Sequence, residues 1–115
     1  MRKIVFILGW LLLILLVSCT EQTTEVPQDL EGNIYNVEIS NFAFLPDTLT
    51  INQGDTVIWI NSDSAAHTET SDSGSELDSA EIAQDQTYSH VFNSPGTYSY
   101  YCTLHPRMKA SIRVQ

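Results

Sequence analysis

From residue 33 onward, apolar and polar residues alternate in short runs, which is the period-two pattern of β-strands with one buried face. Tyr35, Val37 and Ile39 define the first run. Later runs are separated by turn residues, as in Gln53-Gly54-Asp55 and Asn93-Ser94-Pro95-Gly96. Further strands are predicted over residues 48–52, 56–61, 86–92, 97–102 and 111–115.

No long helical pattern accompanies these runs, although a loop or a helical turn is expected in part of residues 72–85. Short strands separated by turns predict an all-β fold, a Greek-key β-sandwich of about seven to eight strands. Bulky residues are available for its core, and we expect them to pack between the two sheets. They are Phe42, Phe44, Trp59, Phe92, Tyr98 and Tyr100.

The N-terminus has a different pattern. Arg2 and Lys3 precede a nearly continuous apolar run from Ile4 to Val17, the layout of an export signal over residues 1–18. Leu16-Val17-Ser18-Cys19 resembles the bacterial lipobox, and this resemblance implies cleavage before Cys19 and a diacylglycerol on its sulfur. A retained N-terminal anchor is the alternative. Either way, we expect an exported protein, periplasmic or at the cell surface, held at a membrane.

Residues 19–32 are polar and acidic, so they cannot bury enough surface to fold and are predicted to form a flexible tether. The single folded domain is then expected over residues 33–115. Acids lie throughout the exported part, and the formal charge of −9 becomes −11 when Arg2 and Lys3 leave with the signal. This charge argues against nucleic acid and against anionic lipid as partners. Most of the acids between Glu69 and Asp85 are expected on a solvated loop, and electrostatic steering of a partner by some of them is a secondary hypothesis.

Candidate chemistry is concentrated in one short segment, where Cys102, His105 and Met108 follow each other at intervals of three residues. Thiolate and thioether ligands suit Cu(I), and imidazole suits either oxidation state of copper. His67, at the end of an apolar run, could supply a further ligand from another loop. A buried structural cysteine is the alternative for Cys102. A disulfide is not expected if lipid occupies Cys19.

Three segments, Ser64-Ala65-Ala66-His67-Thr68, Asn93 to Cys102, and the His105 to Met108 loop, resemble the cupredoxins, the small blue-copper proteins. The Cys-x-x-His-x-x-Met spacing is similar to the short loop of amicyanin-like members. The resemblance implies one type 1 copper ion with three equatorial ligands and an axial one. These would be His67, Cys102 and His105, with Met108 axial.

The resemblance further implies a hydrogen bond between the residue after the first histidine, here Thr68, and Thr103, where most members have Asn or Ser. It implies a monomeric outer-sphere electron carrier, not an enzyme, that meets redox protein partners transiently through an apolar patch around His105. Candidates for the patch are Phe44, Leu45, Pro46, Ala65, Ala66, Leu104 and Pro106. Copper delivery by a metallochaperone, and a metal-free adhesion or scaffold sandwich, are the alternative functions. His90 is expected to be a structural or surface residue.

Overall fold

The computed structural model describes residues 32–115, so the predicted signal (1–18), the predicted lipid site at Cys19 and nearly all of the predicted tether (19–32) lie outside the described residues. Eight strands make up this part of the chain. They are β1 (Ile34–Ser40), β2 (Ala43–Leu45), β3 (Thr48–Ile51), β4 (Thr56–Asn61), β5 (Thr70–Ser71), β6 (Thr87–Val91), β7 (Gly96–Tyr101) and β8 (Lys109–Val114).

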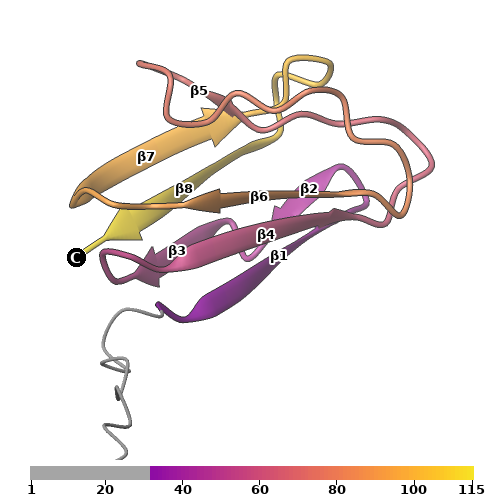
Figure 1. Cartoon of the computed structure of the whole chain (residues 1–115). Helices are drawn as coiled ribbons and strands as arrows, with labels where there is room; N and C mark the ends of the chain where they lie inside the picture. The colour runs from indigo at the N-terminus through magenta and orange to yellow at the C-terminus, as the bar shows by residue number, and fades with distance from the viewer. Residues whose placement is uncertain (1–31) are drawn as a thin grey trace, which may run out of the picture.

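The strands form two four-stranded sheets that face each other as the layers of a sandwich (Figure 1). One sheet has the order β2-β1-β4-β6, and the other has the order β3-β8-β7-β5. Two pairs are parallel, β1 with β4 and β3 with β8. The strands β3 and β4 are neighbours in the sequence but lie in different sheets. The predicted all-β sandwich is therefore confirmed, with eight strands.

Two strands, β2 and β5, were not expected from the sequence. They contain only three and two residues, too few for an alternating pattern to be recognised. Residues 72–85 contain turns and isolated bridges at Asp78 and Ile82 rather than a helical turn. Leu77, in the same segment, packs into the core.

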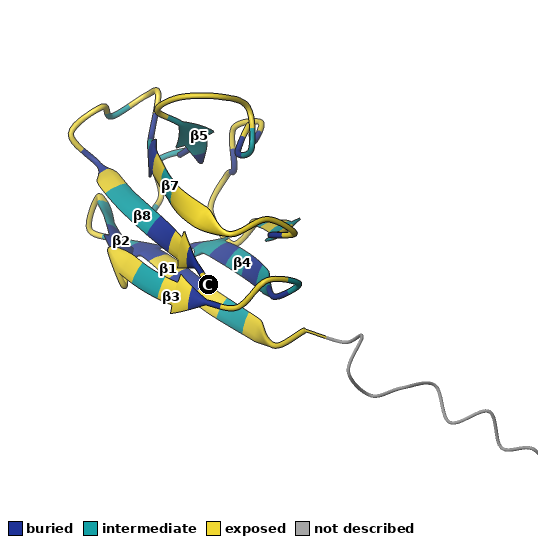
Figure 2. Ribbon diagram, turned by 90° about the vertical axis from the view of Figure 1, so that its left-hand side faces the viewer, coloured by how far each residue is buried: buried dark blue, intermediate teal, exposed yellow. Residues whose placement is uncertain are grey.

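The core lies between the sheets, where buried residues alternate with more exposed ones along β1, β4 and β8 (Figure 2). Trp59 is fully buried, and its indole Nε1 donates a hydrogen bond to the Tyr100 hydroxyl at 3.1 Å across the sandwich. Phe44 and Phe92 are also buried, and Tyr98 is half-buried against them. The expectation for Phe42 was wrong, because this side chain is 53 % exposed.

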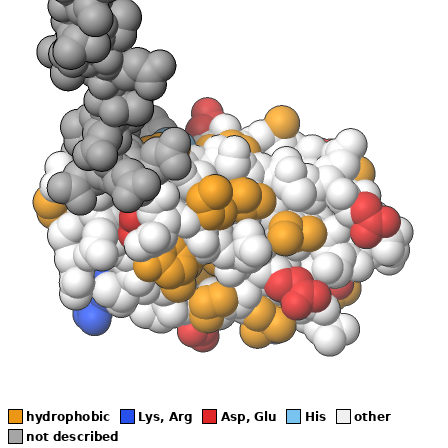
Figure 3. Space-filling model, turned by 60° about the horizontal axis from the view of Figure 1, so that its bottom comes forward, with side chains coloured by type: hydrophobic (Ala, Val, Ile, Leu, Met, Phe, Trp, Pro, Cys, Tyr) orange, Lys and Arg blue, Asp and Glu red, His pale blue; other side chains and the backbone are white. Residues whose placement is uncertain are grey.

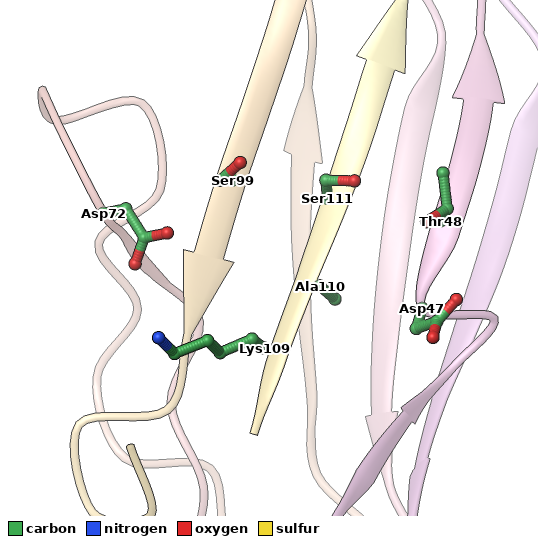
Figure 4. A pocket seen from close by; sticks show the side chains of 7 residues that line it. All are labelled: Asp47, Thr48, Asp72, Ser99, Lys109, Ala110 and Ser111. Atoms are coloured by element: carbon green, nitrogen blue, oxygen red, sulfur yellow. The ribbon is translucent and has the colours of Figure 1, made fainter. Parts of the chain in front are cut away.

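The outer faces of the sheets differ in character. On the first sheet, Ile58 and Ile60 are half-buried and Ile34 and Val91 are exposed, so this side of the molecule carries apolar side chains (Figure 3). The outer face of the second sheet has an open polar hollow (Figure 4). It is lined by Asp47, Thr48, Asp72, Ser99, Lys109, Ala110 and Ser111. Within residues 32–115 there is no helix long and apolar enough to cross a membrane.

Candidate metal centre

The C-terminal hairpin positions three of the four candidate ligands. Strands β7 and β8 pair from Gly96 to Tyr101, and the loop between them holds Cys102, His105 and Met108. Backbone hydrogen bonds close this loop: Cys102 N–H donates to the Met108 carbonyl at 3.1 Å, and Met108 N–H donates to the His105 carbonyl at 2.9 Å. The spacing of three residues thus matches a compact turn that keeps all three side chains at one end of the sandwich.

His67 reaches the same end from a separate loop. It follows β4 and is held by a backbone bridge to Ile82, in which each N–H donates to the other's carbonyl. The side chain is fully buried. Its Nδ1 lies 3.7 Å from the Cys102 Sγ and 3.2 Å from the His105 Nδ1.

Three donor atoms therefore converge. The Cys102 Sγ lies 3.7 Å from each imidazole Nδ1, and the three atoms are all within 4.8 Å of one another. At bond lengths of about 2.0 Å to nitrogen and about 2.3 Å to sulfur, as in zinc sites, an ion with trigonal angles holds an N and an S ligand about 3.7 Å apart. The donor set thus fits a single transition-metal ion, and two imidazoles with one thiolate suit copper.

The fourth candidate and the remaining histidine lie in different environments. Met108 is 5 % exposed and lines a surface hollow together with Phe42, His105, Pro106 and Arg107. His90 is in β6, where its Nε2 lies 2.8 Å from the Glu76 carboxylate. The expectation from the sequence that His90 is a structural or surface residue agrees with this contact.

Thr68 connects the His67 loop to the cysteine loop. Its Oγ1 accepts a hydrogen bond from Thr103 N–H at 2.9 Å and lies 3.0 Å from the Thr103 hydroxyl, so the expected Thr68–Thr103 bond is confirmed. The Thr68 backbone N–H points at the Cys102 Sγ, 3.4 Å away. An N–H donor at this position orients the sulfur.

Asp63 was not expected at the site, because it lies in a polar loop with no motif to mark it. Its Oδ2 is 2.8 Å from the Nε2 of His67, the imidazole nitrogen that points away from the sulfur. Burial raises the pKa of Asp63, but hydrogen bonds from Phe42 N–H, His67 and Asn41 N–H outweigh that effect and hold the pKa below its usual range. Asp63 is therefore a carboxylate that accepts the outward N–H of His67.

A second carboxylate near the centre was predicted wrongly. Glu69, expected on a solvated loop, is fully buried, and neither of its oxygens has a hydrogen-bond partner among the described residues. Burial raises the pKa of Glu69 to about 7. The sequence pattern did not indicate that Glu69 is buried, because an acid between Thr68 and Thr70 is typical of a loop.

An eight-stranded sandwich that brings two imidazoles and a buried cysteine together at one end defines a cupredoxin, a small copper-binding β-protein. The chain belongs to the plastocyanin/azurin family of copper binding proteins, whose family model matches residues 33–115. It is a type 1 copper protein and an electron carrier, as the sequence predicted.

Among curated proteins, amicyanin-alpha from Methylorubrum extorquens is 33% identical over 95 residues, covering 79% of this chain and 80% of the relative. Amicyanin from Paracoccus versutus is 28% identical over 103 residues, covering 86% of this chain and 78% of the relative. The crystal structure of amicyanin from Paracoccus versutus superposes with a TM-score of 0.68 at 30% identity, covering 76% of this chain and 86% of that structure. The similarity thus extends over most of both chains.

Proposed function

We propose that His67, Cys102 and His105 are the equatorial ligands and Met108 the axial ligand of the copper ion through which this protein carries electrons. The observation that supports this assignment most directly is the convergence of three donor atoms within 4.8 Å, at the separations that one bound ion requires. Copper in such a site supplies reversible one-electron chemistry, and two histidines, one cysteine and a weak methionine form a geometry suited to both oxidation states.

The ligands differ in exposure, and this difference suggests a route for the electron. His67 and Cys102 are fully buried, whereas His105 is half-buried at the surface hollow. His105 is therefore the ligand that a partner can approach most closely. A rigid sandwich that fixes the other two ligands limits rearrangement when the charge of the site changes.

The surface around His105 is apolar and suited to brief docking. Phe42 is 53 % exposed and Leu104 is 44 % exposed, and Pro106 is exposed beside them. Arg107 adds a positive charge to this end of an acidic protein, which favours partners with local negative charge. Phe44 does not contribute, contrary to expectation, because it is buried in the core. We infer that redox proteins dock here transiently on a monomer.

Absorption and EPR spectra of the purified protein with one equivalent of Cu(II) test the ligand assignment. We expect an intense visible band from copper–thiolate charge transfer that disappears on reduction and returns on oxidation. Cys102→Ser should abolish the band, whereas His90→Asn, which changes the histidine that pairs with Glu76, should retain it. A Cys102→Ser protein with an unchanged band would contradict the assignment.

Copper delivery is the alternative use of the same ligands, and burial of Cys102 and His67 argues against it. A delivery protein must expose its ligands to an acceptor, whereas here an acceptor can approach only the His105 side. We therefore expect repeated oxidation and reduction in the presence of a Cu(I) chelator without loss of metal. Rapid transfer of copper to the chelator would favour delivery.

We also propose that residues 1–18 direct export, that Cys19 carries lipid and that residues 19–32 tether the domain of residues 33–115 to a membrane. The basic start, the apolar run and the lipobox-like end support this proposal. Cys19→Ser should release the protein from the membrane fraction, whereas Thr20→Ser, a matched change outside the lipid site, should not. Mass spectrometry of the N-terminal peptide should show a diacylglycerol in the wild type and none in Cys19→Ser.

A further inference from the structure

Asp63 connects the copper centre to the docking surface through a single carboxylate. Its Oδ1 accepts a hydrogen bond from Asn41 N–H at 2.8 Å, and its Oδ2 accepts one from Phe42 N–H at 2.9 Å. The same Oδ2 is 2.8 Å from the His67 Nε2. Two oxygens therefore serve three N–H groups that come from two separate loops.

On the His67 side, this contact determines which ring nitrogen faces the metal site and which faces the carboxylate. Because Nδ1 faces the Cys102 sulfur and the His105 imidazole, the proton of a neutral His67 belongs on Nε2, where Asp63 accepts it. A carboxylate on the remote nitrogen orients a ligating imidazole and increases its basicity. Asp63 thus leaves the Nδ1 lone pair free for the metal.

On the other side, the carboxylate stabilises an uncommon backbone shape. Asn41 has φ 52° and Phe42 has φ 57°, so two consecutive residues other than glycine adopt the left-handed conformation. Each such residue costs of order 1 kcal/mol or more unless its surroundings hold it there. Here the N–H groups of both residues point into the Asp63 carboxylate.

This backbone shape determines where the Phe42 ring lies. The ring packs edge-on against both copper imidazoles, with centroid distances of 5.4 Å to His67 and 5.0 Å to His105. It is nevertheless half exposed, so it both covers the ligands and faces an approaching partner. The Asp63 loop is itself held by the end of β4, because Asp63 N–H donates to the side-chain oxygen of buried Asn61 at 2.9 Å.

We propose that Asp63 is a positioning residue that sets the orientation of the ligand His67 and of the docking residue Phe42 together. The proposal rests on the proposed function, because its consequences for electron transfer require copper at His67. Its structural part does not require copper, because the hydrogen bonds from Asn41 and Phe42 N–H to Asp63 involve no atom that would bind the metal. Removing the carboxylate should therefore change three properties together. These are the loop conformation of the metal-free protein, the reduction potential and the rate of electron self-exchange.

Amide hydrogen exchange of the metal-free protein tests the structural part. In Asp63→Ala, the Asn41 and Phe42 amides should exchange about tenfold faster or more, the factor expected for losing a charge-assisted hydrogen bond. Asp63→Asn, a second variant of unchanged shape, has one acceptor oxygen and should expose at least one of the two amides. Unchanged exchange of both amides in both variants would overturn the proposal whatever metal the protein binds.

The copper-loaded protein tests the remainder. Both variants should raise the reduction potential, because the lost negative charge favoured Cu(II), and should slow electron self-exchange measured by NMR line broadening. Phe42→Ala should slow self-exchange as well. Self-exchange in the double variant, Asp63→Ala with Phe42→Ala, should be no slower than in the slower single variant, because the two residues act as a unit. Fully additive effects would overturn the coupling.

Asp55 offers a matched control at the opposite end of β4. Its carboxylate also accepts two backbone N–H bonds, from Asn33 at 2.8 Å and Asn52 at 2.7 Å, but it contacts no imidazole. Asp55→Asn should lower stability while leaving the potential and self-exchange unchanged. A shift in potential equal to that of Asp63→Asn would overturn the proposal, because it would reflect loss of stability alone.

Discussion

At the scale of single residues, Glu69 is a carboxylate that the fold buries without a hydrogen-bond partner among the described residues. Burial favours its neutral form and raises its pKa to about 7 from an ordinary value of 4.5. Between these two values the folded state holds a proton that the unfolded state has released. Stability must therefore fall as the pH rises through this window, by an amount of order 3 kcal/mol in total.

Glu69→Gln removes this titration, since glutamine is neutral at every pH. We expect the variant to match the wild type near pH 4.5 and to be more stable by about 2–3 kcal/mol above pH 7. Denaturant unfolding of the metal-free proteins across this range measures the difference. Glu81→Gln, a change at an exposed position, should alter stability by no more than about 0.5 kcal/mol at any pH. A constant difference between Glu69→Gln and wild type would contradict the prediction.

The sequence predicted those site residues whose side-chain chemistry is distinctive. Cys102, His105 and Met108 combine rare ligand types at a fixed spacing, so their meeting at one end of the sandwich could be expected. Asp63 and Glu69 could not be distinguished from other acids, because their roles depend on contacts made across loops after folding. The exposure of Phe42 was not predictable either, because it depends on a left-handed backbone that turns the side chain outward.

At the scale of elements, the centre depends on a side-chain link between two loops, next to the short pairing of β5 with β7. The Thr68 hydroxyl oxygen lies within hydrogen-bond distance of the Thr70 hydroxyl, the Thr103 hydroxyl and the Thr103 N–H. It therefore joins the loop of His67 to the loop of Cys102. The longer strands were predictable from alternation and turns, but this link was suggested only by resemblance to known proteins.

Thr68→Val keeps the shape of the side chain and removes the oxygen. We expect a loss of about 1–2 kcal/mol in the free energy of unfolding of the metal-free protein, because the Thr103 N–H loses its acceptor. Thr103→Val is the matched control, since it removes only the hydroxyl partner and leaves the N–H bond to Thr68 in place. Denaturant unfolding measures both losses. Equal losses in the two variants would contradict the prediction, because the Thr103 N–H bond would then contribute no more stability than the hydroxyl contact.

At the scale of the whole molecule, the net charge is strongly negative although the surface around His105 is apolar. The chain has a formal charge of −9, yet the copper end carries exposed apolar side chains and Arg107. Long-range electrostatics and close contact thus depend on different properties of the surface. Net charge governs the approach of a partner and is screened by salt, whereas the apolar contact is not.

Small redox reagents of opposite charge should reveal this division. We expect oxidation of the reduced protein by ferricyanide, an anion, to accelerate as ionic strength rises, because repulsion is screened. Oxidation by a cationic cobalt complex should slow over the same range. Stopped-flow absorbance at the visible band measures both rates. The reverse pattern, slower oxidation by ferricyanide and faster oxidation by the cobalt complex as salt rises, would mean that Arg107 and the local surface, not the net charge, control the approach.

Because β8 pairs between β3 and β7, the copper site can form only late in folding. Cys102, His105 and Met108 precede the final strand, so a chain that emerges from its N-terminus presents its sulfur ligands last. The donor set assembles only once the closing hairpin docks beside β3, whose partner residues lie far back in the chain. For an exported chain, folding ends outside the cytoplasm, and the place of folding then decides which metals can reach the ligands.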